Sequence, residues 1–574
     1  MVTPPSDTRD PSRKFKVYKD TVEVVIAPHD DNHDRKSDLD EYPVAKKRGI
    51  KELVLLVFYH LKKHTGVGLV CAVAYFDPGN WGVDLQAGSE YGYSLLFVVL
   101  LCGLFAILIQ CLATRLGCVT GLDLASHCRI LLHSRPKHTK LYRWFGLYPL
   151  YVVSEAAIVA TDLAELLGSA IAMCLLFPRL QLWHGVLITA FDVIFVLALG
   201  DPLRGRPTKY FELLIGAMVF AVLICMCIII AKIDVNWGDT FFGYLPSKYI
   251  IPNGALYTSV GILGATVMPH SIFLGSALAT QDRVSPPPVV PDDSDGESFV
   301  YTNPFFRAVR AVKRATVSAF KIPPPSEYAT TVTRHCDREN KTSEFIKKHL
   351  YHGIIDMAVS LLGFAVVINS LILILASAVF FYGSNGAAGS DSPAGLFEAY
   401  DLIRDFIGQG AATTFAIALL AAGQSSSLIA TVAGQAVSEG FLNWRTSAVV
   451  RRLVTRLLAV IPSMAVAIAI GKPGIDALLV ASQVVLSICL PFVIAPLIYL
   501  TANKNIMRAR KPTVGIFPPG TTEAEMYRQD VETATSEGED FSSNRITTIV
   551  ASCIWVLITL ANIYVLVSLG MGTA

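Results

Sequence analysis

The fold is decided by the stretch AVAYFDPGNW, at residues 72–81. It lies inside a run apolar enough to cross a membrane, which takes about 20 residues as a helix. Pro78 removes a backbone donor there, and Gly79 relaxes the chain next to it. Lipid offers no substitute hydrogen-bond partners, so such a break is tolerated only where the freed backbone lines a cavity. The stretch therefore predicts an interrupted spanning helix with the Asp77 carboxylate at the interruption.

A second candidate span, at residues 254–280, contains Met268, Pro269 and His270. One such break would usually be a simple proline kink. Two breaks, each with a polar side chain, in the first and sixth of ten core spans predict a transporter site between two halves of the chain. The pattern fits two five-helix units of inverted topology with an eleventh helix appended.

The composition agrees with a membrane protein. Hydrophobic residue types make up 53% of the 574 residues and charged types only 16%, whereas soluble domains carry about 25% charged residues. The net charge of +2 gives no reason to expect a nucleic-acid partner. Most of the 11 cysteines lie in apolar runs without paired spacing, which indicates small buried side chains rather than disulfides or a zinc site.

Eleven segments are long and apolar enough to be spanning helices, which predicts an all-α integral membrane protein. They lie near residues 66–89, 93–114, 146–177, 182–200, 210–232, 254–280, 353–382, 410–438, 449–470, 476–501 and 546–570. Basic residues gather in alternate connections, and these should face the cytoplasm. The N-terminus, which does not have the pattern of a signal peptide, is then cytoplasmic. The C-terminus is extracellular or lumenal.

The predicted organisation is a cytoplasmic, disordered tail at 1–63, a transporter core of ten helices at 64–501, a cytoplasmic loop at 502–545 and a last helix with the C-terminus at 546–574. The core contains a long cytoplasmic insert at 281–352.

Two parts of the cytoplasmic connections have open interpretations. Aromatic and basic residues alternate at near-helical spacing at 305–321, which fits either an amphipathic helix on the inner leaflet or a solvated charged linker. The acidic stretch 520–541 is expected to be a flexible loop.

The side chains at the breaks favour a class of ligand. They are the Asp77 carboxylate, the Asn80 amide and the Met268 thioether, together with unwound backbone carbonyls. A thioether is a soft ligand that favours transition metals over calcium and magnesium, and magnesium prefers octahedral oxygen coordination. A methionine alone is usually core filler, but its place beside Pro269 in a broken helix favours a role as a ligand.

Several motifs, in order along the chain, resemble the Nramp family of proton-coupled divalent-metal transporters, and most of all its fungal members. They are AVAYFDPGNW at 72–81 with DLQAG at 84–88, DLAE at 162–165, GATVMPH at 264–270, GQSSS at 423–427 with AGQ at 433–435 and EGF at 439–441, and SQVVLS at 482–487. The resemblance covers about residues 60–570 apart from the insert.

The resemblance implies a leucine-transporter-like fold with alternating access and import of Mn²⁺ or Fe²⁺, also Cd²⁺ or Co²⁺, with protons. It implies no permanently bound cofactor. The implied metal ligands are Asp77, Asn80, Ala265 through its carbonyl, Met268 and, in some states, Gln483. The implied proton route runs through Asp77, His270, Asp162, Glu165 and Arg456.

The proton route has a physical basis in the sequence. Asp162 and Glu165 are three residues apart and share one helix face. Adjacent carboxylates repel, so one of them should hold a proton, although structural ion pairing is the alternative. His270 can change charge near neutral pH, but a lone histidine in a membrane helix is more often a hydrogen-bonded packing residue.

Three departures from the common family pattern concern the proton path more than the metal ligands. Ser271 stands where many relatives have Asn, Gly275 where many have a second His, and Cys489 where Gln is frequent.

Two other functions remain open at this stage. A sodium-coupled amino-acid carrier of the same fold would want hydroxyl and apolar residues at the breaks, and Asp77 with Met268 argues against it. The second alternative is a membrane metal receptor that signals through residues 281–352 without net metal flux. No nucleophile or HExxH-type pattern predicts an enzyme. The home membrane is either the plasma membrane or an endosomal or vacuolar one.

Overall fold

The computed structural model describes residues 66–133, 135, 137–190, 203, 209–250, 254–283, 335, 340–383, 395–443, 448–509 and 538–571. By contacts the chain divides into two units, Met1–Leu55 and Leu56–Ala574. All described residues belong to the second unit. The predicted tail and the basic segment 305–321 lie outside them.

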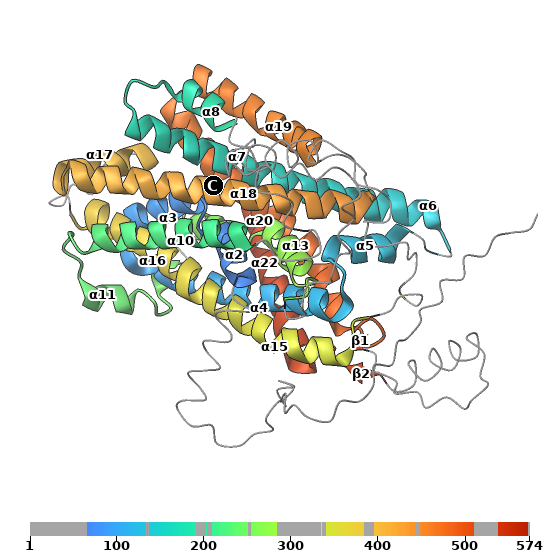
Figure 1. Ribbon diagram of the computed structural model, residues 1–574. Helices are drawn as coiled ribbons and strands as arrows, with labels where there is room; N and C mark the ends of the chain where they lie inside the picture. The colour runs from blue at the N-terminus through green and yellow to red at the C-terminus, as the bar shows by residue number, and fades with distance from the viewer. Residues whose placement is uncertain are drawn as a thin grey trace, which may run out of the picture. The chain divides into compact units, whose positions relative to one another are not determined.

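The described part is almost entirely helical (Figure 1). The helices of its first half are α2 (Val67–Val73), η1 (Ala74–Phe76), α3 (Pro78–Tyr91), η2 (Gly92–Leu95), α4 (Leu96–Thr120), α5 (Leu124–His133), α6 (Thr139–Tyr142), η3 (Arg143–Leu147), α7 (Tyr148–Leu176), α8 (Leu182–Ala190), α10 (Lys209–Ile230), α11 (Trp237–Phe242), η4 (Lys248–Ile250), α12 (Ala255–Thr266) and α13 (Pro269–Leu278).

The helices of the second half are α15 (Ser343–Ser360), η7 (Leu361–Val366), α16 (Val367–Ala376), η8 (Ser377–Phe381), α17 (Leu396–Phe406), α18 (Gln409–Leu442), α19 (Ala448–Ala469), α20 (Lys472–Ala502) and α22 (Arg545–Met571). Among the described residues, eight helical stretches are long and apolar enough to cross a membrane, and Val67–Phe76 and Val454–Ala469 are shorter apolar helices. Every predicted span contains helix, but the fourth is described only as α8, so the count of eleven remains a prediction.

Two features of the connections that the sequence predicts to be cytoplasmic differ from the prediction. Helix α15 begins at Ser343, inside the predicted insert, because the Thr342 hydroxyl caps it by accepting a hydrogen bond from Phe345 N at 3.3 Å. The all-helical prediction also misses an antiparallel pair of short strands, β1 (Arg508–Ala509) and β2 (Glu539–Asp540). The pair lies between α20 and α22, outside the helical stretches that are long and apolar enough to cross a membrane.

The long helices α7, α18 and α20 form the packing centre of the second unit. Helix α7 packs against both α18 and α20, while α3 packs against α16 and α12 packs against α20. In Figure 1, α7 and α18 run side by side along most of their length. The interrupted helices thus lie against long, uninterrupted ones, which can hold their polar groups in place.

Candidate metal site at two helix interruptions

The first spanning helix is interrupted at Asp77. Helix α2 and the turn η1 end at Phe76, Asp77 has extended backbone angles, and α3 begins at Pro78. The Asp77 carboxylate caps α3: its Oδ1 atom accepts hydrogen bonds from Asn80 N at 2.8 Å and from Asn80 Nδ2 at 3.0 Å. Because the Asn80 amide nitrogen donates to Asp77, the amide oxygen of Asn80 remains available to coordinate a bound cation.

The second interruption is at Met268. Helix α12 ends at Thr266, Met268 is extended, and α13 begins at Pro269. In an α-helix the Ala265 carbonyl would accept a bond from the nitrogen of residue 269. A proline stands there and has no N–H to donate, so this carbonyl is available to a ligand. Pro78 frees the Ala74 carbonyl in the same way.

Helix α20 contacts both interruptions. The Gln483 amide lies so close to Gly79 that a Cβ atom there would be 1.8 Å from Gln483 Nε2. The Gln483 Oε1 atom is buried and has no hydrogen-bond partner among the described residues. The Met268 side chain packs in a cluster that includes Leu486 and Cys489 of the same helix.

Helix α7 also contacts both interruptions. A Cβ atom at Gly168 would be 1.9 Å from Pro78 Cβ, so only glycine allows this approach. On the other side, the Thr161 hydroxyl lies 3.2 Å from His270 Nδ1. Two long helices therefore connect the segments that carry the candidate ligands.

The candidate ligands are sealed from solvent in this conformation. Asp77 and Met268 are fully buried, and Asn80 and Ala265 are 1% exposed. The Asp77 Oδ2 atom has no hydrogen-bond partner among the described residues. Nowhere in the described part do three or more His, Cys, Asp or Glu side chains gather as a metal cluster. A cation here would therefore be held by one carboxylate and neutral ligands.

His270 has a defined orientation. Thr161 Oγ1 donates to the Ala157 carbonyl at 2.9 Å, so toward His270 the hydroxyl oxygen acts as the acceptor. We therefore assign the proton of the neutral imidazole to Nδ1. The Nε2 atom, which is buried and has no partner among the described residues, is then the nitrogen that can accept a proton.

Asp162 follows Thr161 on α7 and pairs with a cation. Arg456 Nη1 donates to Asp162 Oδ1 at 2.7 Å, and Arg456 Nη2 donates to Ser427 Oγ at 2.6 Å. The side chains of Asp162 and Arg456 are 1% and 4% exposed. The sequence reasoning named both residues but not the serine that holds the guanidinium.

Glu165, one turn further along α7, is fully buried. The Ser426 hydroxyl donates to its Oε1 atom at 2.6 Å. Two consecutive serines of the GQSSS motif on α18 therefore contact two acidic residues of α7 or their partners: Ser426 binds Glu165, and Ser427 binds the arginine that pairs with Asp162. The sequence showed the motif but not the roles of its serines. A hydroxyl that donates to a carboxylate is a common way to satisfy a buried acidic group.

Some polar groups near the site carried no clear signal in the sequence. The Gln110 amide on α4 accepts from Tyr75 Oη at 3.2 Å and donates to the Ser271 carbonyl at 3.2 Å. Asn369 Nδ2 on α16 donates to the Tyr75 carbonyl at 2.7 Å. The one sequence signal that Gln110 has a specific partner is that its polar amide lies inside an apolar span.

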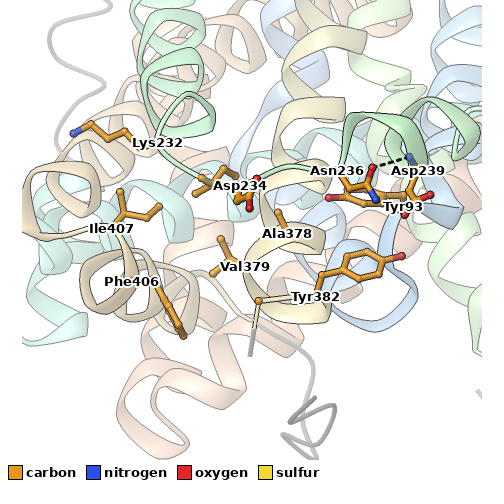
Figure 2. Close-up of a pocket in the computed structure, with 12 residues that line it drawn as sticks. Tyr93, Lys232, Asp234, Asn236, Asp239, Ala378, Val379, Tyr382, Phe406 and Ile407 are labelled. Atoms are coloured by element: carbon orange, nitrogen blue, oxygen red, sulfur yellow. Dashed lines mark hydrogen bonds between the residues drawn. The ribbon is translucent and has the colours of Figure 1, made fainter. Parts of the chain in front are cut away.

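A cavity of about 690 Å³ lies apart from these residues (Figure 2). It is lined by Tyr93, by the residues that follow α10, by part of η8 and the two residues after it, by the end of α17, and by the start of α11. There, Asn236 Nδ2 donates to Asp239 Oδ2 at 2.6 Å. It contains none of the predicted site residues, so it is not the candidate metal site.

Comparison with known proteins identifies the family. The family model described as natural resistance-associated macrophage protein-like, Nramp, matches residues 68–515. The chain belongs to the Nramp family. Nramp proteins are membrane transporters, so this chain is a transporter and not an enzyme.

Fungal relatives match almost the whole chain. The manganese transporter pdt1 of Schizosaccharomyces pombe is 36% identical over 97% of this chain and 95% of the relative. The iron transporter SMF3 of Saccharomyces cerevisiae is 36% identical over 89% and 96%. A crystal structure of the Eremococcus coleocola manganese transporter matches with a TM-score of 0.57 at 27% identity, covering 92% of this chain and 97% of that one. The chain therefore shares a mostly helical transporter fold with this solved manganese transporter.

Proposed function

We propose that this Nramp protein imports divalent transition-metal ions, Mn²⁺ or Fe²⁺, into the cytoplasm by proton symport with alternating access. The observation that carries the proposal is the buried pair of interruptions. They bring a carboxylate, an amide oxygen, a freed carbonyl and a thioether into two segments that share α7 and α20 as neighbours. Fungal relatives named as manganese and iron transporters support the choice of metals.

The ligand set supports selectivity among cations. Asp77 supplies the one full negative charge, Asn80 and Ala265 supply neutral oxygens, and Met268 supplies soft sulfur. Sulfur adds little to the binding of Ca²⁺ or Mg²⁺ but strengthens the binding of Mn²⁺, Fe²⁺ and especially Cd²⁺. Gln483, with its unpartnered Oε1 atom next to Gly79, is the fifth proposed ligand.

Alternating access is supported by the closed environment of the ligands. Asp77 and Met268 are fully buried, so a hydrated ion cannot reach them from either side unless helices move. Half-helices are suited to such movement because the extended residues between them, Asp77 and Met268, can absorb changes in backbone angle.

The proposed proton route leads from the metal site to α7. It passes from Asp77 and His270 through Thr161 to Asp162, which Arg456 holds at 2.7 Å. Glu165 lies next to it and is held by Ser426. A proton that arrives at Asp162 must either displace its pairing with Arg456 or move on.

The proposed orientation places the N-terminus in the cytoplasm and the C-terminus outside or in a lumen, because the basic connections gather on one side. The two inverted five-helix repeats and the total of eleven spans belong to the same proposal.

The function is tested by reconstituting the full chain in liposomes and measuring uptake of Mn²⁺ and acidification of the interior with and without an imposed proton gradient. We expect metal uptake that increases when the outside is more acidic, together with internal acidification. Metal binding without any uptake would support a receptor instead.

A further inference from the structure

Asp84 is a buried carboxyl group that the proposed mechanism does not use. It is 2% exposed, and its Oδ2 atom has no hydrogen-bond partner among the described residues. An ionised carboxylate is costly to bury in a membrane helix without a donor or a cation. Such a group is retained where it has a function, so Asp84 calls for one.

Asp84 lies on the same face of α3 as Asp77, the residue that caps this helix. Seven residues separate the two, which is close to two helical turns, so their Cα atoms are about 10 Å apart along the axis. Asn80 lies on the same face, between them. The two carboxyl groups therefore flank the candidate ligand Asn80 on one side of the same half-helix.

The groups whose charge acts on Asp84 are few. The charges of Asp84 and Asp77, the N-cap of the same helix, act on each other, and α3 carries one further carboxyl group, Glu90, near its end. On α4, the uncharged Cys102 thiol lies within reach of the Asp84 charge. Helices α12, α16 and η8, which pack against α3, contain no Asp, Glu, Lys, Arg or His. The other charged groups on helices that contact α3 are Glu155, Asp162 and Glu165 on α7, Lys472 and Asp476 on α20, Glu398, Asp401, Arg404 and Asp405 on α17, and Glu439 on α18.

This environment makes the charge of Asp84 depend on the metal. With the site empty, two ionised carboxylates on one face would repel each other without a counter-ion. A divalent cation bound at Asp77 reverses the local sign from negative to positive. At about 10 Å and an effective dielectric constant of about 20, one unit charge changes an equilibrium on the order of tenfold, and the two charges of a divalent cation change it on the order of a hundredfold.

We infer that Asp84 is a metal-linked proton site: it holds a proton while the site at Asp77 is empty and releases that proton to water when a divalent cation binds. The O–H bond of the Asp84 carboxyl breaks, the electron pair stays on the carboxylate oxygen, and the resulting negative charge attracts the bound cation. This inference rests on the proposed metal site at Asp77.

The test is calorimetric titration of Mn²⁺ into the purified full chain, in pairs of buffers with different ionisation enthalpies, from mildly acidic to mildly alkaline pH. The buffer pairs report how many protons leave per bound metal. The chains compared are wild type, Asp84→Asn, Asp84→Glu and a control, Asp239→Asn, which removes an exposed carboxylate on α11.

We expect Asp84→Asn to bind Mn²⁺ on the order of a hundredfold more weakly at alkaline pH and as tightly as wild type at acidic pH. It should release up to one proton fewer per metal. Asp84→Glu and Asp239→Asn should behave like wild type. Weakening by the same factor at every pH, or unchanged proton release, would overturn the inference, because a purely structural defect does not depend on the charge of residue 84.

Infrared difference spectra keep the inference testable if Asp84→Asn does not fold. Mn²⁺ binding to wild type should remove a protonated-carboxyl band that shifts in frequency in Asp84→Glu, and a band that does not shift would exclude Asp84. The metal site itself is tested separately with Asp77→Ala. If Asp77→Ala binds Mn²⁺ like wild type, the proposed function is wrong. If Asp77→Ala loses Mn²⁺ binding while Asp84→Asn binds Mn²⁺ like wild type at every pH, only the inference about Asp84 is wrong.

Discussion

The amide of Gln110 on α4 fills the space beside Gly275 on α13. A Cβ atom at position 275 would lie 1.6 Å from Gln110 Nε2. Gln110 is fully buried and is held by the Tyr75 hydroxyl and by the Ser271 carbonyl, each at 3.2 Å. The side chain beside Gly275 is therefore a neutral amide from another helix.

This contact predicts that Gly275→His is not tolerated alone. Inserting a ring against the bonded amide should cost about 1–3 kcal/mol of folding free energy through overpacking. The double variant Gly275→His, Gln110→Ala makes room and should recover much of that loss. Thermal unfolding in detergent measures both. Equal stability of the single variant and wild type would show that the Gln110 side chain moves aside freely.

Met268→Leu should change metal preference with little effect on stability, because Leu and Met have similar volumes and the surrounding cluster includes Leu486 and Cys489. Without the sulfur, Cd²⁺ binding should weaken more than Mn²⁺ binding, and Ca²⁺ and Mg²⁺ should compete better. Competition for uptake in liposomes measures the order. If the order of preference is unchanged, the thioether is not a ligand.

Asp162→Asn should uncouple protons from metal uptake more than His270→Ala does. The α7 carboxylate is the group that Arg456 holds at 2.7 Å, whereas the hydrogen bond between His270 and α7 goes to the neutral hydroxyl of Thr161. Metal flux should persist in Asp162→Asn but lose most of its dependence on external pH. Paired records of Mn²⁺ uptake and internal acidification decide the matter.

A control is needed because Asp162→Asn leaves Arg456 buried without its counter-charge, which can cost about 3–5 kcal/mol. The double variant Asp162→Asn, Arg456→Gln removes both charges and should fold better while remaining uncoupled. If His270→Ala loses proton flux and Asp162→Asn keeps it, the route runs through α13 instead.

Much of this arrangement could be predicted from sequence because proline chemistry is local. Pro78 and Pro269 interrupt their helices wherever the rest of the chain lies, so both breaks and their polar side chains were visible. The partners of those side chains were not, because contacts such as Ser426 with Glu165 join helices that are distant in sequence. The Gln110 contact with Gly275 was hidden for the same reason.

The strands β1 and β2 and the early start of α15 were missed for a different reason. The predicted boundaries followed hydropathy, and hydropathy changes where a helix enters lipid rather than where its backbone hydrogen bonds begin. The Thr342 cap of α15 lies in the polar connection, so a search for capping residues would have placed the helix start more accurately.

The central claim is that the Asp77 site carries metal together with protons. Its most direct test is Mn²⁺ uptake with simultaneous internal acidification, in liposomes that contain equal amounts of folded wild type or Asp77→Ala and face an acidic exterior. The account predicts that wild type shows both signals, and that Asp77→Ala, which lacks the only full negative charge among the proposed ligands, shows no metal uptake while remaining folded and inserted. Wild-type Mn²⁺ uptake by well-folded Asp77→Ala would contradict it.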